Sequence, residues 1–254
     1  MSELCLDVRN VSVVFGGLVA VKDFSMQVKK GTVHALIGPN GAGKSTTFNC
    51  ISRYYQPTRG QILLNGQDIT RLHPNQMAAL GVARTFQNLE LFNELTVLEN
   101  VMLGTYSHSR TTLRTLLRFN PREVVEYSQH LLERLGLISY SNIKASALNY
   151  GHQKLLELAR ALAIRPNLLL LDEPAAGLRN REIESVDHLL RELVDKDGIT
   201  VLLVEHVMQL VMSISDQITV LSFGQKIAEG PPSVVQRDPN VIEAYLGKEE
   251  AQYV

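Results

Sequence analysis

Cysteine, excess charge of one sign and long apolar runs are all scarce in this 254-residue sequence. The two cysteines, Cys5 and Cys50, are too few and too far apart to indicate a disulfide framework or a structural metal site. The 25 Lys and Arg residues nearly balance the 26 Asp and Glu residues, so net charge gives no indication of nucleic-acid binding. No run of 18 apolar residues occurs, and the first residues lack the pattern of a leader peptide. We therefore expect a soluble protein of the reducing cytosol.

The size and composition that remain describe a globular chain. Hydrophobic residues make up 45% and charged residues 20%, which excludes a disordered protein. A chain of this length is near the upper limit for one hydrophobic core, so one domain or two subdomains are expected. No internal repeat or low-complexity linker is visible in the sequence.

The first third of the chain reads as strands separated by turns. Residues 4–15 and 24–30 alternate apolar and polar side chains on either side of Gly16 and Gly17, which predicts half-buried antiparallel strands. Residues 33–37, VHALI, form a short apolar run typical of a strand buried on both faces. The other elements predicted here are a helix from about Lys44 to Pro57 and a strand with a turn over residues 61–70.

From about Pro74 to Ala163 the apolar residues recur three and four positions apart, which predicts a helical insertion. Buried strands are expected again at residues 168–172 and 200–206, with an amphipathic helix between them that ends at Gly198. A strand, helix and strand in this order predict a parallel sheet. The last predicted element is a hairpin over residues 218–230.

The string GPNGAGKS, which starts at Gly38, matches the P-loop pattern of Gly, four residues and then Gly-Lys-Ser, between a predicted strand and a predicted helix. At average residue usage a chance match arises in roughly one such chain per hundred. In a P-loop, glycines let backbone amides wrap a phosphate, the lysine neutralises the outer phosphates and the serine hydroxyl serves Mg²⁺. The expected phosphate-binding residues are Gly38, Pro39, Asn40, Gly41, Ala42, Gly43, Lys44, Ser45 and Thr46.

The string LLLLDEP places Asp172 at the carboxyl end of a buried strand, where parallel sheets bind ligands. Asp172 suits Mg²⁺, which needs about one or two carboxylates beside phosphates and waters. Glu173 is then available to accept a proton from an attacking water. The alternative is that Asp-Glu-Pro is only a turn. Gln87 and His206 also stand where they could point at a γ-phosphate, although an isolated Gln or His is more often a surface or capping residue.

Taken together and in this order, GPNGAGKS, Gln87, LNYGHQ, LLLLDEP and His206 resemble the nucleotide-binding subunit of an ABC transporter, over essentially the whole chain. The strings FGGLVAV, RTFQN, LNYG, DEPAAGL, LVEH and AYLG resemble ATP-binding subunits of branched-chain amino acid importers and their close relatives. The resemblance implies an α/β P-loop NTPase fold with a RecA-like parallel core, an N-terminal antiparallel β subdomain and an inserted helical subdomain. Residues 1–254 would form one nucleotide-binding domain, with the core at 1–87 and 161–254 and the helical subdomain at 88–160.

The resemblance also implies the cofactors ATP and Mg²⁺ and a role for each matching residue. Catalysis would depend on Glu173, on the switch histidine His206, on Lys44 and on the Q-loop residue Gln87. The remaining roles fall to Ser45, Gln87 and Asp172 at Mg²⁺, to Phe15 against adenine, and to Asn149, Gly151 and His152 of the signature, which would hold the γ-phosphate of the opposite subunit. This chain departs from the common signature Leu-Ser-Gly-Gly-Gln at Asn149, Tyr150 and His152, and it carries Arg179 where the subgroup usually has Asn.

The implied partners are a second ATP-binding subunit, identical or paralogous, membrane-spanning permease subunits and a solute-binding protein, with no nucleic acid. The implied location is peripheral, on the cytoplasmic face of the inner (plasma) membrane. Alternatives are an importer of urea or amides and a soluble ABC ATPase of DNA repair or translation. A P-loop GTPase or small-molecule kinase is disfavoured because the sequence has no Asn-Lys-x-Asp guanine motif.

Four arginines recur every four residues and would form one basic stripe on a helix. Two interpretations stay open, a solvated face of the helical insertion and a contact with lipid headgroups or an acidic membrane subunit. The residues are Arg110, Arg114, Arg118 and Arg122.

Overall fold

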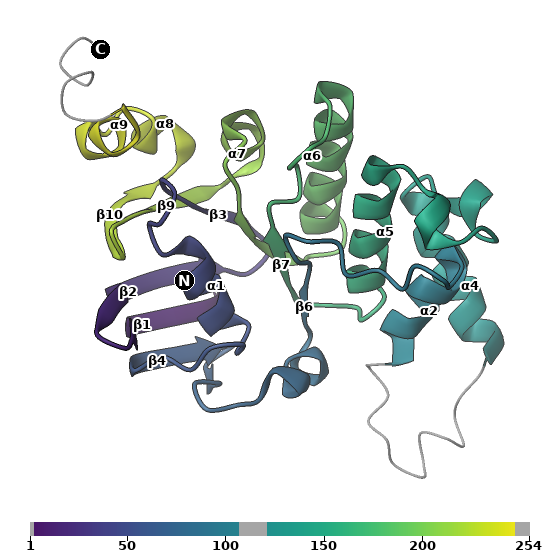
Figure 1. Cartoon of the computed structure of the whole chain (residues 1–254), viewed down its shortest axis with the longest axis horizontal. Coiled ribbons are helices and arrows are strands. Elements are labelled where there is room, and N and C mark those ends of the chain that lie inside the picture. The colour runs from purple at the N-terminus through teal and green to yellow at the C-terminus, as the bar shows by residue number, and fades with distance from the viewer. Residues whose placement is uncertain (1–2, 107–120, 247–254) are drawn as a thin grey trace. The chain divides into compact units, whose positions relative to one another are not determined.

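The structure is a computed structural model that describes residues 3–106 and 121–246 (Figure 1). The chain divides into one compact unit of Met1–Pro74 and Leu190–Val254 and a second of Asn75–Leu189. Arg110, Arg114 and Arg118 lie outside the described residues, whereas Arg122 is exposed. No helix in the described part of the chain is both long and apolar enough to span a membrane.

The first unit opens with an antiparallel sheet in the order β2-β1-β4-β5. The strands are β1 (Leu4–Phe15), β2 (Leu18–Lys29), β4 (Arg59–Leu64) and β5 (Gln67–Asp68). The predicted pair of strands is confirmed, but β2 begins six residues before the predicted start at Phe24. Asp23 has a positive φ of 47°, and the β1–β2 register shifts between Val11 and Val13. This irregularity breaks the period-2 alternation and hides the first half of β2 from sequence analysis.

The same unit contains a buried parallel arrangement around β3 (Val33–Ile37). This strand pairs in parallel with β8 (Thr200–Val204) and with β9 (Gln217–Ser222), and β9 forms an antiparallel hairpin with β10 (Gln225–Gly230). Every residue of β3 and β8 is buried, as the apolar runs predict. The helices of this unit are α1 (Lys44–Ile51), α7 (Met208–Ile214), α8 (Pro232–Val235) and α9 (Pro239–Leu246).

The prediction that the helix after the glycine loop reaches Pro57 is wrong, because α1 ends at Ile51. The Ser52 hydroxyl donates to the carbonyl of Phe48 at 2.9 Å, and Arg53 adopts a positive φ of 68°. A residue in the left-handed region ends a helix even where the side chains would allow it to continue.

The second unit pairs β6 (Val82–Arg84) with β7 (Leu168–Asp172) in parallel. Its helices are α2 (Val97–Tyr106), α4 (Pro121–Arg134), α5 (Tyr150–Leu162) and the start of α6 (Asn180–Asp195), with 3₁₀ turns at Ala78–Leu80, Ile138–Tyr140 and Ala145–Ala147. Helix α2 packs against α4 and α5 (Figure 1). The helical prediction from Pro74 onward is wrong at β6, which is only three residues long and depends on pairing with β7 rather than on a local pattern.

A buried histidine in β3 predicts how stability depends on pH. The His34 side chain is 1% exposed, and its Nε2 lies 2.8 Å from the Thr219 hydroxyl of β9. Burial, together with nearby Lys226, lowers the pKa of His34 from 6.5 to about 4. Below pH 6.5 the unfolded chain binds a proton that the folded chain binds only near pH 4, so the free energy of unfolding should fall by about 3 kcal/mol across this window.

The measurement is urea unfolding at several pH values between 7 and 4, for the unmodified chain and for His34→Gln. The variant keeps a polar group for Thr219 but cannot titrate. We expect the fall in unfolding free energy toward pH 4 to be shallower in His34→Gln. Equal pH slopes in the two proteins would contradict this assignment.

Candidate functional site

The glycine loop between β3 and α1 forms a cradle that depends on glycine at three positions. Gly38, Gly41 and Gly43 have φ values of 151°, 76° and 98°. A Cβ on Gly38 would lie 2.1 Å from the carbonyl oxygen of Leu221, and one on Gly43 would lie 2.7 Å from that of Ala20. The loop therefore keeps its shape only with glycine at these positions.

The polar groups of this loop suit an anion. The Lys44 ammonium donates to the carbonyl oxygens of Gly38, at 2.7 Å, and Pro39, at 3.0 Å, so it lies over its own loop. Helix α1 begins at this lysine, and a helix leaves its first N–H groups without intrahelical acceptors at its positive end. Ser45, in the same turn, is exposed. An ammonium, a hydroxyl and helix N–H groups together fit the phosphates of a nucleotide.

Phe15 ends β1 in the same unit and is 46% exposed. Its ring meets that of Tyr55 edge-on, with 5.4 Å between centroids. An exposed aromatic ring held by a second ring has a face on which a flat ligand could stack. Sequence analysis missed Tyr55, because the contact joins two segments 40 positions apart.

His206 follows β8, also in the first unit, and its side chain is 59% exposed. The preceding carboxylate, Glu205, is buried and accepts the backbone N–H groups of His206 at 2.7 Å and Val207 at 2.9 Å. Glu205 therefore fixes the backbone from which the histidine projects. Sequence analysis did not find this role, although the LVEH string contains the residue.

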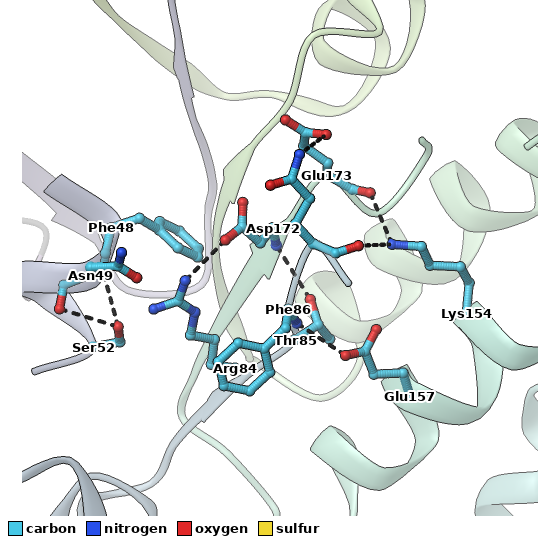
Figure 2. A network of polar contacts seen from close by, with 11 residues as sticks. Phe48, Asn49, Ser52, Arg84, Thr85, Phe86, Lys154, Glu157, Asp172 and Glu173 are labelled. Atoms are coloured by element: carbon cyan, nitrogen blue, oxygen red, sulfur yellow. Dashed lines mark hydrogen bonds and ion pairs between the residues drawn. The ribbon is translucent and has the colours of Figure 1, made fainter. Parts of the chain in front are cut away.

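In the second unit Asp172 ends β7 and is 6% exposed (Figure 2). Arg84 at the end of β6 donates to its Oδ2 at 2.9 Å, and the backbone N–H of Asp172 donates to the Thr85 hydroxyl at 3.3 Å. Burial raises the pKa of Asp172, and Arg84 opposes that rise. Sequence analysis placed Asp172 correctly at the strand end but missed its arginine partner.

The structure brings Gln87 and Glu173 together, with the Gln87 side-chain amide donating to the Glu173 carboxylate at 3.1 Å. The buried Lys154 of α5 lies against both residues from the other side, with its Nζ 3.4 Å from each backbone carbonyl oxygen (Figure 2). Glu173 itself has a positive φ of 51°. Sequence analysis assigned roles to Gln87 and Glu173 but missed Lys154.

The LNYGHQ string runs into the first turn of α5, which begins at Tyr150. Asn149 is the N-cap, and its side-chain oxygen accepts the N–H of His152 at 2.9 Å. Gly151 lies in the first turn, where a Cβ would come within 2.7 Å of a carboxylate oxygen of Glu182. The Glu182 carboxylate therefore lies beside Gly151, at the positive end of this helix.

The donor chemistry fits a hard cation that binds mainly to phosphates and water. Ser45 has an exposed hydroxyl and Asp172 a buried carboxylate, and each taken by itself is an oxygen donor of the kind that such a cation prefers. Within residues 3–106 and 121–246, no group of three or more His, Cys, Asp or Glu residues could hold a metal ion by itself. Mg²⁺ in nucleotide sites needs no such cage, since about one or two carboxylates suffice.

A strand, a glycine loop with positive φ values and a helix whose first lysine lies over the loop define the class of P-loop nucleotide-binding proteins. The family model for "ABC transporter" matches residues 21–176, and that for "Branched-chain amino acid ATP-binding cassette transporter" matches residues 225–251. The chain belongs to the ABC transporter family.

Individual relatives agree with this assignment. The chain is 44% identical to the high-affinity branched-chain amino acid transport ATP-binding protein BraF of Pseudomonas aeruginosa, over 98% of this chain and 100% of the relative. It is 42% identical to LivG of Escherichia coli over the same shares. The solved structure of a nucleotide-free ATP-binding cassette from an ABC transporter matches with a TM-score of 0.86 at 34% identity, covering 96% of this chain and all of that one. The dimeric, post-hydrolysis cassette MJ0796 bound to ADP and Pi matches with a TM-score of 0.79 at 27% identity, covering 89% and 98%.

These findings confirm the predicted family, the α/β P-loop fold and the ATPase activity. They support a transporter ATPase over a soluble repair or translation ATPase.

Proposed function

We propose that this chain is the ATP-hydrolysing subunit that powers import of branched-chain amino acids. The observation that carries the proposal is the Lys44-capped glycine cradle in a chain that aligns end to end with BraF and LivG. Urea or amides are the second candidate class of substrate, and the names of the relatives support branched-chain amino acids over them.

Within this proposal each residue has the role that the order of motifs along the chain indicates. Gly38 to Thr46 bind the phosphates, and Phe15 stacks against adenine. Bound Mg²⁺, held by Ser45 and Asp172 with Gln87 beside it, would neutralise charge on the phosphates. Glu173 accepts the proton of the attacking water, and the Gln87 amide, 3.1 Å away, orients its carboxylate. Lys44 and His206 stabilise the charge that develops on the transferred phosphate.

We propose further that two such subunits work as a dimer. Residues 88–160 then act as the helical subdomain, and the turn of Asn149, Gly151 and His152 holds the γ-phosphate of the opposite nucleotide. Helix α5 is 13 residues long, so its positive end is suited to an anion. The dimeric cassette MJ0796 supports this arrangement.

The remaining assignments concern the assembly. The second ATP-binding subunit is identical or a paralogue, and the pair sits peripherally on membrane-spanning permease subunits at the cytoplasmic face of the inner (plasma) membrane. A separate solute-binding protein delivers the substrate. No nucleic acid takes part, consistent with the balanced charge of the chain.

The test is to purify the chain with its permease subunits, reconstitute the complex in vesicles and measure ATP hydrolysis with the solute-binding protein present. Leucine, isoleucine or valine should stimulate hydrolysis and enter the vesicles, whereas urea and acetamide should not. Stimulation by urea alone would select the second candidate. Equal hydrolysis of GTP and ATP, with no response to any solute, would contradict the importer.

A further inference from the structure

The buried ammonium of Lys154 is not accounted for by any role assigned above. Lys154 lies in the second turn of α5 and is 7% exposed. A buried ammonium needs hydrogen-bond acceptors, because desolvation of an uncompensated charge is costly. Its Nζ lies 3.4 Å from the backbone carbonyl oxygens of Gln87 and Glu173, as the dashed lines at Lys154 in Figure 2 mark. The same Nζ lies 5.9 Å from the centre of the Tyr150 ring. One side chain therefore contacts the signature turn, the Q-loop and the residue proposed as general base.

A second side chain of α5 holds the same segment. Glu157 is buried three residues beyond Lys154, and its carboxylate accepts the backbone N–H of Phe86 at 3.0 Å. Residues three apart lie on one face of a helix. The helix thus contacts the peptide groups of Phe86 and Gln87 through one acceptor and one donor, which fixes this segment against α5 (Figure 2).

Glu173 depends on this attachment more than an ordinary residue would. Its φ of 51° is unfavourable for a residue with a side chain and persists only where neighbouring groups impose it. Lys154 binds its carbonyl oxygen and Gln87 binds its carboxylate. The Glu173 carboxylate is therefore oriented both through its own backbone and through the Gln87 side chain. Lys154 contacts the backbone carbonyl of each of these two residues.

We propose that Lys154 is a positioning residue that couples the signature turn of α5 to the carboxylate of Glu173. The inference rests on the proposed function, since it concerns the hydrolytic step of the same site. Because α5 is one continuous helix from Tyr150 to Leu162, a displacement of its first turn moves Lys154 as well. Lys154 transmits the displacement to the peptide groups of Gln87 and Glu173, so that engagement of the signature aligns the general base.

The experiment replaces Lys154 by methionine, which keeps the length and apolar stem of the side chain but removes the ammonium. Steady-state ATP hydrolysis is measured, and kcat is divided by the number of ATP-binding sites found by equilibrium binding. We expect kcat per site to fall about 10- to 100-fold, as small misplacements of catalytic groups do. The KM for ATP should change by less than about threefold, since the cradle is untouched. Lys154→Arg should restore most of the rate, and Lys196→Met, at a lysine side chain that is 72% exposed, is the matched control.

A purely structural role for Lys154 predicts a different result. Lys154→Met would then lower the thermal midpoint and the number of binding sites but leave kcat per site within about twofold, which would overturn the proposal. If Lys154→Met does not fold, kcat per ATP-binding site is measured for Lys154→Gln instead, with the same expected outcomes. Coupling to the signature is tested with Asn149→Ala. The double variant should lose little beyond the larger single loss, whereas independent, multiplicative losses would contradict the coupling.

A Lys44→Ala variant, measured in parallel, distinguishes failure of the proposed ATPase function from failure of the positioning role of Lys154. If Lys44→Ala hydrolyses ATP as the unmodified chain does, the proposed function fails. If Lys44→Ala is inactive while Lys154→Met keeps its rate per site, only the positioning role fails.

Discussion

Replacing Lys44 by alanine is expected to reduce ATP hydrolysis about 10²- to 10³-fold. The ammonium lies over the glycine loop, 2.7 Å from the Gly38 carbonyl oxygen, and is the cation that the loop offers to a phosphate. Its removal leaves the charge that develops during phosphoryl transfer without its main protein counter-charge. The fold should survive, because the backbone pairing of β3 with β8 does not involve the lysine side chain.

The measurement is steady-state phosphate release, with Lys30→Ala as the control. The Lys30 side chain is 40% exposed and pairs with Glu3 at 2.8 Å. It has no proposed role in phosphate binding, so its loss should leave the rate unchanged. Hydrolysis by Lys44→Ala at the unmodified rate would refute the phosphate site.

Glu173→Gln is expected to retain ATP but to hydrolyse it about 10²- to 10⁴-fold more slowly, because glutamine cannot accept the proton of the attacking water. The substitution conserves size, so the contact of Lys154 with the backbone carbonyl of Glu173 is kept. Because the proposed dimer holds each ATP between two subunits, a variant that retains ATP should accumulate as an ATP-bound dimer.

Size-exclusion chromatography with and without ATP and Mg²⁺ measures this, alongside nucleotide binding. Glu184→Gln on the exposed side of α6 is the matched control and should remain monomeric at the same concentrations. A Glu173→Gln protein that binds ATP and still elutes as a monomer would count against the dimer and against Glu173 as the base.

Sequence analysis located those parts of the site that are encoded by a short run of consecutive residues, namely the phosphate loop and the carboxyl end of the leucine-rich strand. Gly41 and Gly43 have positive φ values, which glycine adopts most readily, so the short string from Gly38 to Ser45 already indicates a phosphate loop. Asp172 was predictable for a similar reason, since a run of leucines marks a buried strand and the first polar residue marks its end.

The misplaced boundaries have non-local causes. The three residues of β6 contain no periodicity and form a strand only by pairing with residues 168–170. The helix α1 ends where Arg53 turns to the left-handed region, and that arginine donates to the carbonyl oxygens of Cys50 and Tyr55. The local hydrophobic pattern therefore predicts neither the strand β6 nor the end of α1.

The amino-acid sequence by itself determined the family, the phosphate cradle and the identity of the acidic residues, because these depend on short strings whose chemistry is complete in themselves. Only the tertiary structure decided which groups control those residues. Arg84 pairs with Asp172 from 88 positions away, and Lys154 of helix α5 contacts both Gln87 and Glu173. A buried charge must find its partner wherever the chain fold brings one, and the spacing of residues along the chain does not contain that information.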